Sequence, residues 1–198
     1  MEIQKHIDAV MERPGMLGVF GLILFTDRHP HLAKVMGDDD YWKAFNSISG
    51  DSFAIFSAKP ANGRYVLPSA PPGFLQMMVP IWSEPEQNNG LLSTFHLNST
   101  EHLPKFVVFA QMPDGRICQC SIKLTDQSEA HAYAELRKVI DVVSAAAKKI
   151  GPEYSGNTEN VYLAFEQAVS GFKQQTILLT MSRYIPFVKE ALSFFAKS

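Results

Sequence analysis

The spacing of apolar residues along the chain predicts helices and strands in mixed order. Residues 3–11 and 29–49 carry apolar positions three and four apart, which predicts two helical segments, the second interrupted at Gly37. Residues 17–26 are almost continuously apolar, which predicts a strand buried on both faces, and 52–58 predict a second, shorter strand. A strand, a helix and a strand in this order form a unit whose helix crosses over, so that the two strands pair in parallel.

The next part of the chain predicts a short helix followed by a β-hairpin. Apolar residues within 91–97 indicate the helix, and the runs 103–110 and 117–124 predict the two strands. The turn between the strands falls on 112–115, which contains Pro, Asp and Gly. Pro104 stands at the start of the hairpin, a position that tolerates a residue without a backbone N–H.

Three more helices are expected after the hairpin. The first spans 126–150 with one apolar stripe and ends at Gly151 and Pro152. The second spans 158–172. The third begins near Pro186, a residue that suits the first turn of a helix.

The third of these helices is apolar on two adjoining strips, one of which contains Phe187, Ala191 and Phe194. A helix that is apolar nearly all round must be buried. We therefore expect this strip to contact a protein partner or a second copy of the chain. The alternative is that the helix folds back over the segment 59–90 and covers Met77, Met78 and Trp82.

Residues 59–90 form a distinct segment that contains six of the twelve prolines. A loop of this length without secondary structure is uncommon, and is usually either functional or disordered. The apolar run 74–82 argues against disorder, because disordered segments lack such residues. We expect an ordered insertion with one extra strand.

This order of elements, with Pro104 at the start of the hairpin, resembles the thioredoxin-like superfamily over residues 17–150. The resemblance implies an α/β fold: a three-layer sandwich around a mixed sheet, here with the Pro-rich insertion 59–90 and additional C-terminal helices. We expect a single domain over 1–198, in which 151–198 form a helical extension. The resemblance also implies that the Leu103–Pro104 peptide bond is cis and lies beside the loop that follows the first strand.

That loop, residues 26–31, lacks the Cys-x-x-Cys motif of the family, so it holds no thiolate for disulfide exchange. Asp27, Arg28, His29 and His31 could instead bind an anionic or glutathione-like ligand beside the proline, through positive side chains and the backbone amides at the helix start. The alternative is that they are solvated polar residues at a strand-to-helix junction.

Two other groups of polar residues are better explained by structure than by chemistry. Cys118 and Cys120 share one side of a strand, where a strain-free disulfide is disfavoured and packing in the core is common. The functional alternatives are a redox pair or soft metal ligands. Asp38, Asp39 and Asp40 lack the alternate spacing of calcium loops and suit the start of a helix. We expect no metal site and no cofactor.

Charge and composition narrow the possible functions. The 198 residues carry a net charge of −2 with scattered Lys and Arg, so we expect no nucleic-acid partner. No apolar run approaches the roughly 20 residues that span a bilayer, and no signal-peptide pattern opens the chain, so we expect no membrane association and a cytoplasmic location.

Two hypotheses follow for the function. We favour a non-catalytic thioredoxin-like module that acts in protein–protein interaction or assembly, with a protein partner or as a homo-oligomer. The alternative is a small-molecule binding protein or enzyme that uses the loop 26–31 beside Pro104.

Overall fold

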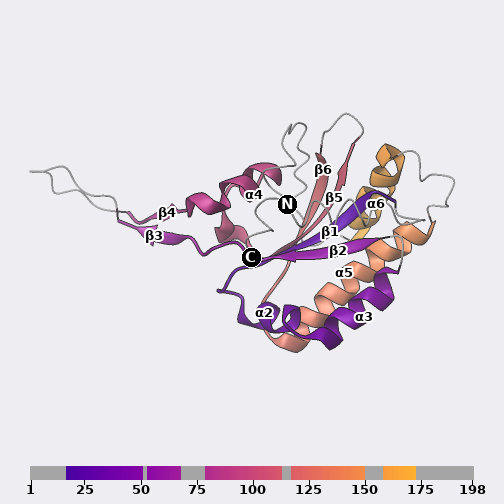
Figure 1. Cartoon of the computed structure of the whole chain (residues 1–198), viewed down its shortest axis with the longest axis horizontal. Coiled ribbons are helices and arrows are strands. Elements are labelled where there is room, and N and C mark those ends of the chain that lie inside the picture. The colour runs from indigo at the N-terminus through magenta and orange to yellow at the C-terminus, as the bar shows by residue number, and fades with distance from the viewer. Residues whose placement is uncertain (1–16, 51–52, 68–78, 113–116, 150–157, 173–198) are drawn as a thin grey trace, which may run out of the picture.

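The computed structural model describes residues 17–50, 53–67, 79–112, 117–149 and 158–172. Within these ranges it is a mixed α/β structure built around a four-stranded sheet in the order β2-β1-β5-β6 (Figure 1). The strands are β1 (Val19–Leu24), β2 (Ala54–Ala58), β5 (Lys105–Gln111) and β6 (Ile117–Lys123). β1 pairs in parallel with β2, while β1 with β5 and β5 with β6 pair antiparallel. The predicted strand-helix-strand unit, the hairpin and the mixed sheet are therefore confirmed.

Two helices connect β1 to β2, with a break at the predicted glycine. They are α2 (Pro30–Met36) and α3 (Asp39–Ser49), and Gly37 ends the first. The Asp38 side chain accepts a hydrogen bond from the backbone N–H of Asp40 at 2.8 Å, which makes it the N-cap of α3. The capping interpretation of these acidic residues is confirmed for Asp38.

Helices cover both faces of the sheet, which explains why every residue of β1 is buried. On one face, α5 (Glu129–Lys149) and α6 (Thr158–Phe172) join α2 and α3 over a large core that includes Val19 and Ile23. On the other face, the short α4 (Asn89–Thr94) contributes to a smaller core that includes Leu22 and Leu24. Successive side chains of a strand point to opposite faces, so β1 supplies both cores.

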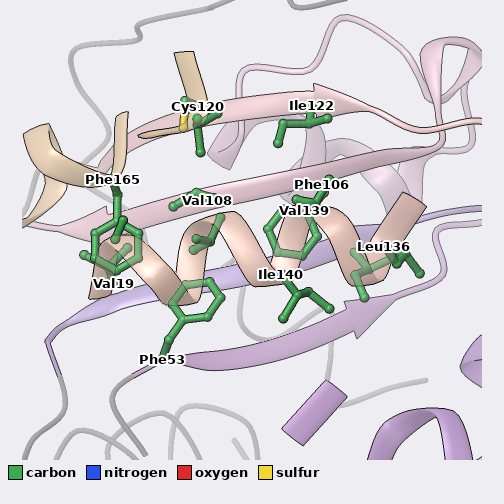
Figure 2. Packing of buried hydrophobic residues seen from close by; sticks show 14 of the residues in the cluster. Val19, Phe53, Phe106, Val108, Cys120, Ile122, Leu136, Val139, Ile140 and Phe165 are labelled. Carbon is green, nitrogen blue, oxygen red and sulfur yellow. The ribbon is translucent and has the colours of Figure 1, made fainter. Parts of the chain in front are cut away.

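The predicted apolar stripe of α5 packs against the sheet. Figure 2 shows Leu136 and Ile140 of this helix in one cluster with Phe106 of β5. At one end of the cluster Phe53 stacks on Phe165 of α6, with ring centroids 5.6 Å apart. The stripe therefore lies where a spacing of three and four residues places it.

The described residues of the insertion, 59–67 and 79–90, contain two strands, so the expectation of one was wrong. β3 (Arg64–Val66) and β4 (Ile81–Ser83) form a separate antiparallel pair, which we call the arm. Figure 1 shows the arm extending away from the four-stranded sheet, next to α4. Two short 3-10 helices follow, η1 (Glu86–Asn88) before α4 and η2 (Thr100–His102) before β5. Strands of three residues are too short to leave a periodic pattern.

Some predicted elements lie outside the described residues and stay predictions. These are the helix over 3–11, most of the hairpin turn, and the C-terminal helix with Phe187, Ala191 and Phe194. Within the described ranges, no helix combines the length and the apolar character needed to cross a bilayer.

Candidate functional site

The loop after β1 lies beside the start of β5, as the resemblance implied. The Leu103–Pro104 peptide bond is cis, which confirms that expectation. The Nε2 atom of His29 lies 3.0 Å from the carbonyl oxygen of Leu103, and this contact joins the loop to the segment before Pro104. Pro104 itself is buried.

His29 is a structural link, because both of its ring nitrogens bind the protein. The backbone N–H of Thr26 donates to Nδ1 at 3.0 Å. Since a backbone amide can only donate, Nδ1 carries no proton, and Nε2 donates its proton to the Leu103 carbonyl. His29 is only 8% exposed, and burial is the main cause that lowers its pKa, against the opposing charge of Asp126. The ring is therefore neutral and enclosed.

The backbone amides at the start of α2 are already occupied by a carboxylate. Asp126 accepts from the N–H of Leu32 at 2.7 Å and from the N–H of His31 at 3.4 Å. An external anion would have to displace Asp126 to reach these amides. The helix start proposed as an anion site is thus satisfied from within the chain.

The side chains of Asp27 and Arg28 contact the insertion and the segment after it. Asp27 forms an ion pair with Lys59. The guanidinium carbon of Arg28 lies 4.5 Å from the centre of the Trp82 ring, and its Nη2 donates to the carbonyl oxygen of Thr100 at 3.3 Å. A cation over an indole ring contributes about 0.5–2 kcal/mol, depending on exposure. The loop therefore contacts the insertion through Asp27 and Arg28.

Glu84, which follows β4, is the centre of the contacts at the base of the arm. Its carboxylate accepts from the indole N–H of Trp82 and from both the backbone N–H and the hydroxyl of Thr100, the hydroxyl at 2.8 Å. Asn88 donates to it at 3.3 Å. Burial alone would raise the pKa of Glu84, but these hydrogen bonds together hold it below its usual value. Glu84 thus remains a carboxylate that joins the arm to η2.

Two further contacts complete the base of the arm. Tyr65 packs edge-on against Trp82, with ring centroids 5.0 Å apart, and its hydroxyl donates to Glu101. The side-chain amide of Asn88 exchanges two hydrogen bonds with the backbone of Ala61, at 2.8 and 3.1 Å. The arm is therefore held on the side that carries Trp82.

Sequence reasoning found the loop but missed its partners. Lys59, Glu84 and Thr100 carry no motif, and Arg28 meets the Thr100 carbonyl across 72 positions of the chain. The available signals were the high proline content of 59–90, which marked a distinct segment, and the apolar run 74–82, which predicted that it is ordered. Neither signal says what holds the segment in place.

The two cysteines lie on the core side of β6, near α6. Cys120 is fully buried and Cys118 is half-buried, and they are not joined by a disulfide. The hydroxyl of Tyr162 lies near both thiols, and burial is the main cause that raises its pKa. This placement is the one expected of cysteines that pack in a core.

Neither a metal cluster nor a known relative points to a function. Across the residues that the structure describes, no three His, Cys, Asp or Glu side chains gather closely enough to hold a metal ion. Comparisons with protein-family models, with curated proteins and with solved structures find no match. The function is therefore inferred from the contacts of the chain itself.

Proposed function

We propose that the protein is a non-catalytic module with a thioredoxin-like fold that acts in protein–protein interaction. The topology supports the fold assignment: a parallel pair, β1 and β2, is extended by an antiparallel hairpin, β5 and β6, and helices lie on both faces. The contact of His29 with Leu103 supports the equivalence of the loop 26–31 with the family's active-site loop.

The observation that carries the proposal is that this loop binds the protein itself. Asp27 pairs with Lys59, Arg28 covers Trp82, and His29 is enclosed between Thr26 and Leu103. The loop also lacks the thiols that disulfide exchange requires. Because the polar groups of the loop hold the insertion in place, a structural role of the loop is favoured over a catalytic one.

The interaction role rests on where apolar side chains meet solvent. Exposed large apolar residues gather on or next to the arm: Tyr65 (56%), Leu67 (59%), Val79 (67%) and Ile81 (54%). Across the described part of the chain, Leu163 is the one other residue of this kind. Clusters of exposed apolar side chains mark interaction sites.

An insulin-reduction assay tests the non-catalytic part of the proposal. With dithiothreitol as the reductant, the protein should reduce insulin disulfides no faster than dithiothreitol alone, while a thioredoxin with its Cys-x-x-Cys motif accelerates the reaction. The variant Cys118→Ser/Cys120→Ser is the matched control. Turnover by the parent that disappears in this variant would show a redox enzyme with a displaced site.

One observation favours the alternative of an anionic ligand near Pro104. Lys105 follows the proline and lies directly opposite Lys123 on β6. Burial, together with the charge of Lys123, lowers the pKa of Lys105. Within the described ranges neither lysine has an ion pair. Facing like charges on neighbouring strands are unfavourable, and a bound anion would relieve them.

Thermal unfolding in inorganic phosphate tests this alternative. If the two lysines bind an anion, phosphate should raise the melting temperature of the parent more than that of Lys105→Gln/Lys123→Gln. Chloride at equal ionic strength separates binding from screening. An equal response of the parent and the variant rejects the anion site.

A further inference from the structure

The arm has an inner face, which contacts the loop 26–31 and η2, and an outer face on the opposite side of its two strands. Tyr65 and Trp82 are directly opposite each other, and Arg28 packs on the Trp82 ring, so this pair defines the inner face. Neighbouring residues of a strand point to the opposite side. Arg64, Val66, Ile81 and Ser83 therefore form the outer face of the arm.

The outer face combines an apolar pair with one charge. Val66 lies directly opposite Ile81, and Ile81 is more than half exposed. Arg64 is the one charged residue of the four. Within the part of the chain that the structure describes, Arg64 takes part in none of the ion pairs. The outer face therefore offers a partly exposed apolar pair and a guanidinium that has no carboxylate partner among these residues.

The edges of the arm also have capacity for another strand. Among the described residues, β3 and β4 pair only with each other. The outer edge of each strand therefore presents backbone N–H and C=O groups that can form a further ladder. A two-stranded sheet is only marginally stable by itself, whereas a third strand adds both hydrogen bonds and apolar contact.

We propose that the arm binds an extended segment of a partner protein as a third strand beside β3. The proposal rests on the proposed interaction function and names its surface and the chemistry of its partner. Residues directly opposite on neighbouring strands contact each other, so the segment presents a carboxylate to Arg64 and an apolar side chain to Val66. Main-chain hydrogen bonds supply affinity and these two positions supply specificity.

A second copy of the chain fits this surface less well than an acidic partner strand. The residues of β3 are Arg64, Tyr65 and Val66, which include no carboxylate. Antiparallel pairing of two β3 strands about Tyr65 would set each Arg64 against Val66, and parallel pairing would bring the two arginines together. Charge complementarity therefore favours a different chain with Asp or Glu in its strand.

Selection from a displayed library of random peptides about eight residues long tests the proposal. The full chain is the bait, and three variants are compared with it: Val66→Asp at the apolar position of β3, Arg64→Glu at the charge, and Leu163→Asp as the control. Leu163 is an exposed apolar residue but lies on α6. Circular dichroism and melting temperature establish that each variant is folded before selection.

The parent and Leu163→Asp should select peptides with alternating apolar residues and an Asp or Glu two positions from an apolar one. A fluorescent copy of a selected peptide should bind Val66→Asp at least tenfold more weakly, and methylation of the peptide's backbone nitrogens should abolish binding. Arg64→Glu should select Lys or Arg in place of the acid. No selection by the parent, equal binding by Val66→Asp, or an unchanged acid preference in Arg64→Glu would overturn the proposal.

These outcomes are separate from those of the insulin assay. Insulin reduction by the parent would reject the non-catalytic function even if peptides bind the arm. Failure of peptide selection would reject the arm as a strand acceptor but would not affect the conclusion that the protein is non-catalytic. A parent that self-associates without selecting peptides would show that the occupant is a second copy.

Discussion

Replacement of Glu84 by Gln should loosen the arm while leaving the four-stranded sheet folded. The carboxylate receives hydrogen bonds from Trp82, Asn88 and two donors of Thr100. Gln keeps the shape of the side chain but replaces one acceptor oxygen with an NH2 group, which repels donors. The change therefore weakens the hydrogen bonds through which one carboxylate connects β4, η1 and η2.

The size of the effect follows from the charge of the acceptor. A hydrogen bond to a charged group contributes about 1.5–3 kcal/mol, against about 0.5–1.5 kcal/mol for a neutral pair. Four bonds that each lose about 1 kcal/mol give an upper limit of about 4 kcal/mol, and bonds that share one carboxylate are not additive. We expect about 2 kcal/mol, which corresponds to an about 30-fold larger equilibrium constant for local opening of the arm.

Hydrogen exchange measured by mass spectrometry resolves this opening. At pH 7, peptides that cover β3 and β4 should exchange about 30-fold faster in Glu84→Gln, while peptides from β1 and β5 keep the parent rate. Glu86→Gln is the matched control, because Glu86 is exposed and lies two residues further along. Equal exchange of the arm in the two variants would refute the role of Glu84.

The pH dependence of the same variant gives a second check. The pKa of Glu84 is lowered in the folded protein, so its contribution is fully present above the ordinary value of 4.5. The contribution is lost as the pH falls below 4.5 and through the folded-state pKa. The difference in stability between the parent and Glu84→Gln should therefore shrink in acid, and a difference that stays constant would contradict a charged acceptor.

Three other predictions concern the loop, the core and the C-terminal helix. Because the pKa of His29 is lowered in the folded protein, the unfolded chain takes up a proton first as the pH falls below 6.5. The free energy of unfolding should therefore decrease in acid more for the parent than for His29→Asn. Urea titrations at pH 7.5 and 5.5 measure this decrease, and an equal decrease in the two proteins would refute the prediction. Cys118→Ser/Cys120→Ser should lower the free energy of unfolding by about 1–3 kcal/mol, since a buried hydroxyl needs a partner; an unchanged urea midpoint would contradict it. In sedimentation velocity, Phe187→Asp/Phe194→Asp should dissociate an oligomer or complex that the parent forms. If the parent is a monomer and the variant unfolds, the apolar strip belongs to the core instead.

Local patterns along the chain determined the elements and much of the core. The stripe of α5 and the bounds of α6 were predictable because residues three and four apart share a helix face. The burial of β1 on both faces was predictable because its residues are apolar without alternation. The cap at Asp38 was predictable because it depends on an amide two residues away. In each case the physical cause lies within a few positions of the residue.

Only the tertiary structure shows which groups the loop 26–31 contacts. The sequence shows Arg28 and His29 as charged or titratable groups near a helix start, which suits an anion site as well as a structural one. Their partners, the carbonyls of Thr100 and Leu103, lie 72 and 74 positions away, and Asp126, which occupies the helix amides, lies 94 positions from Leu32. No periodicity records which polar groups meet across such separations, because the meeting depends on how the sheet and the insertion fold together.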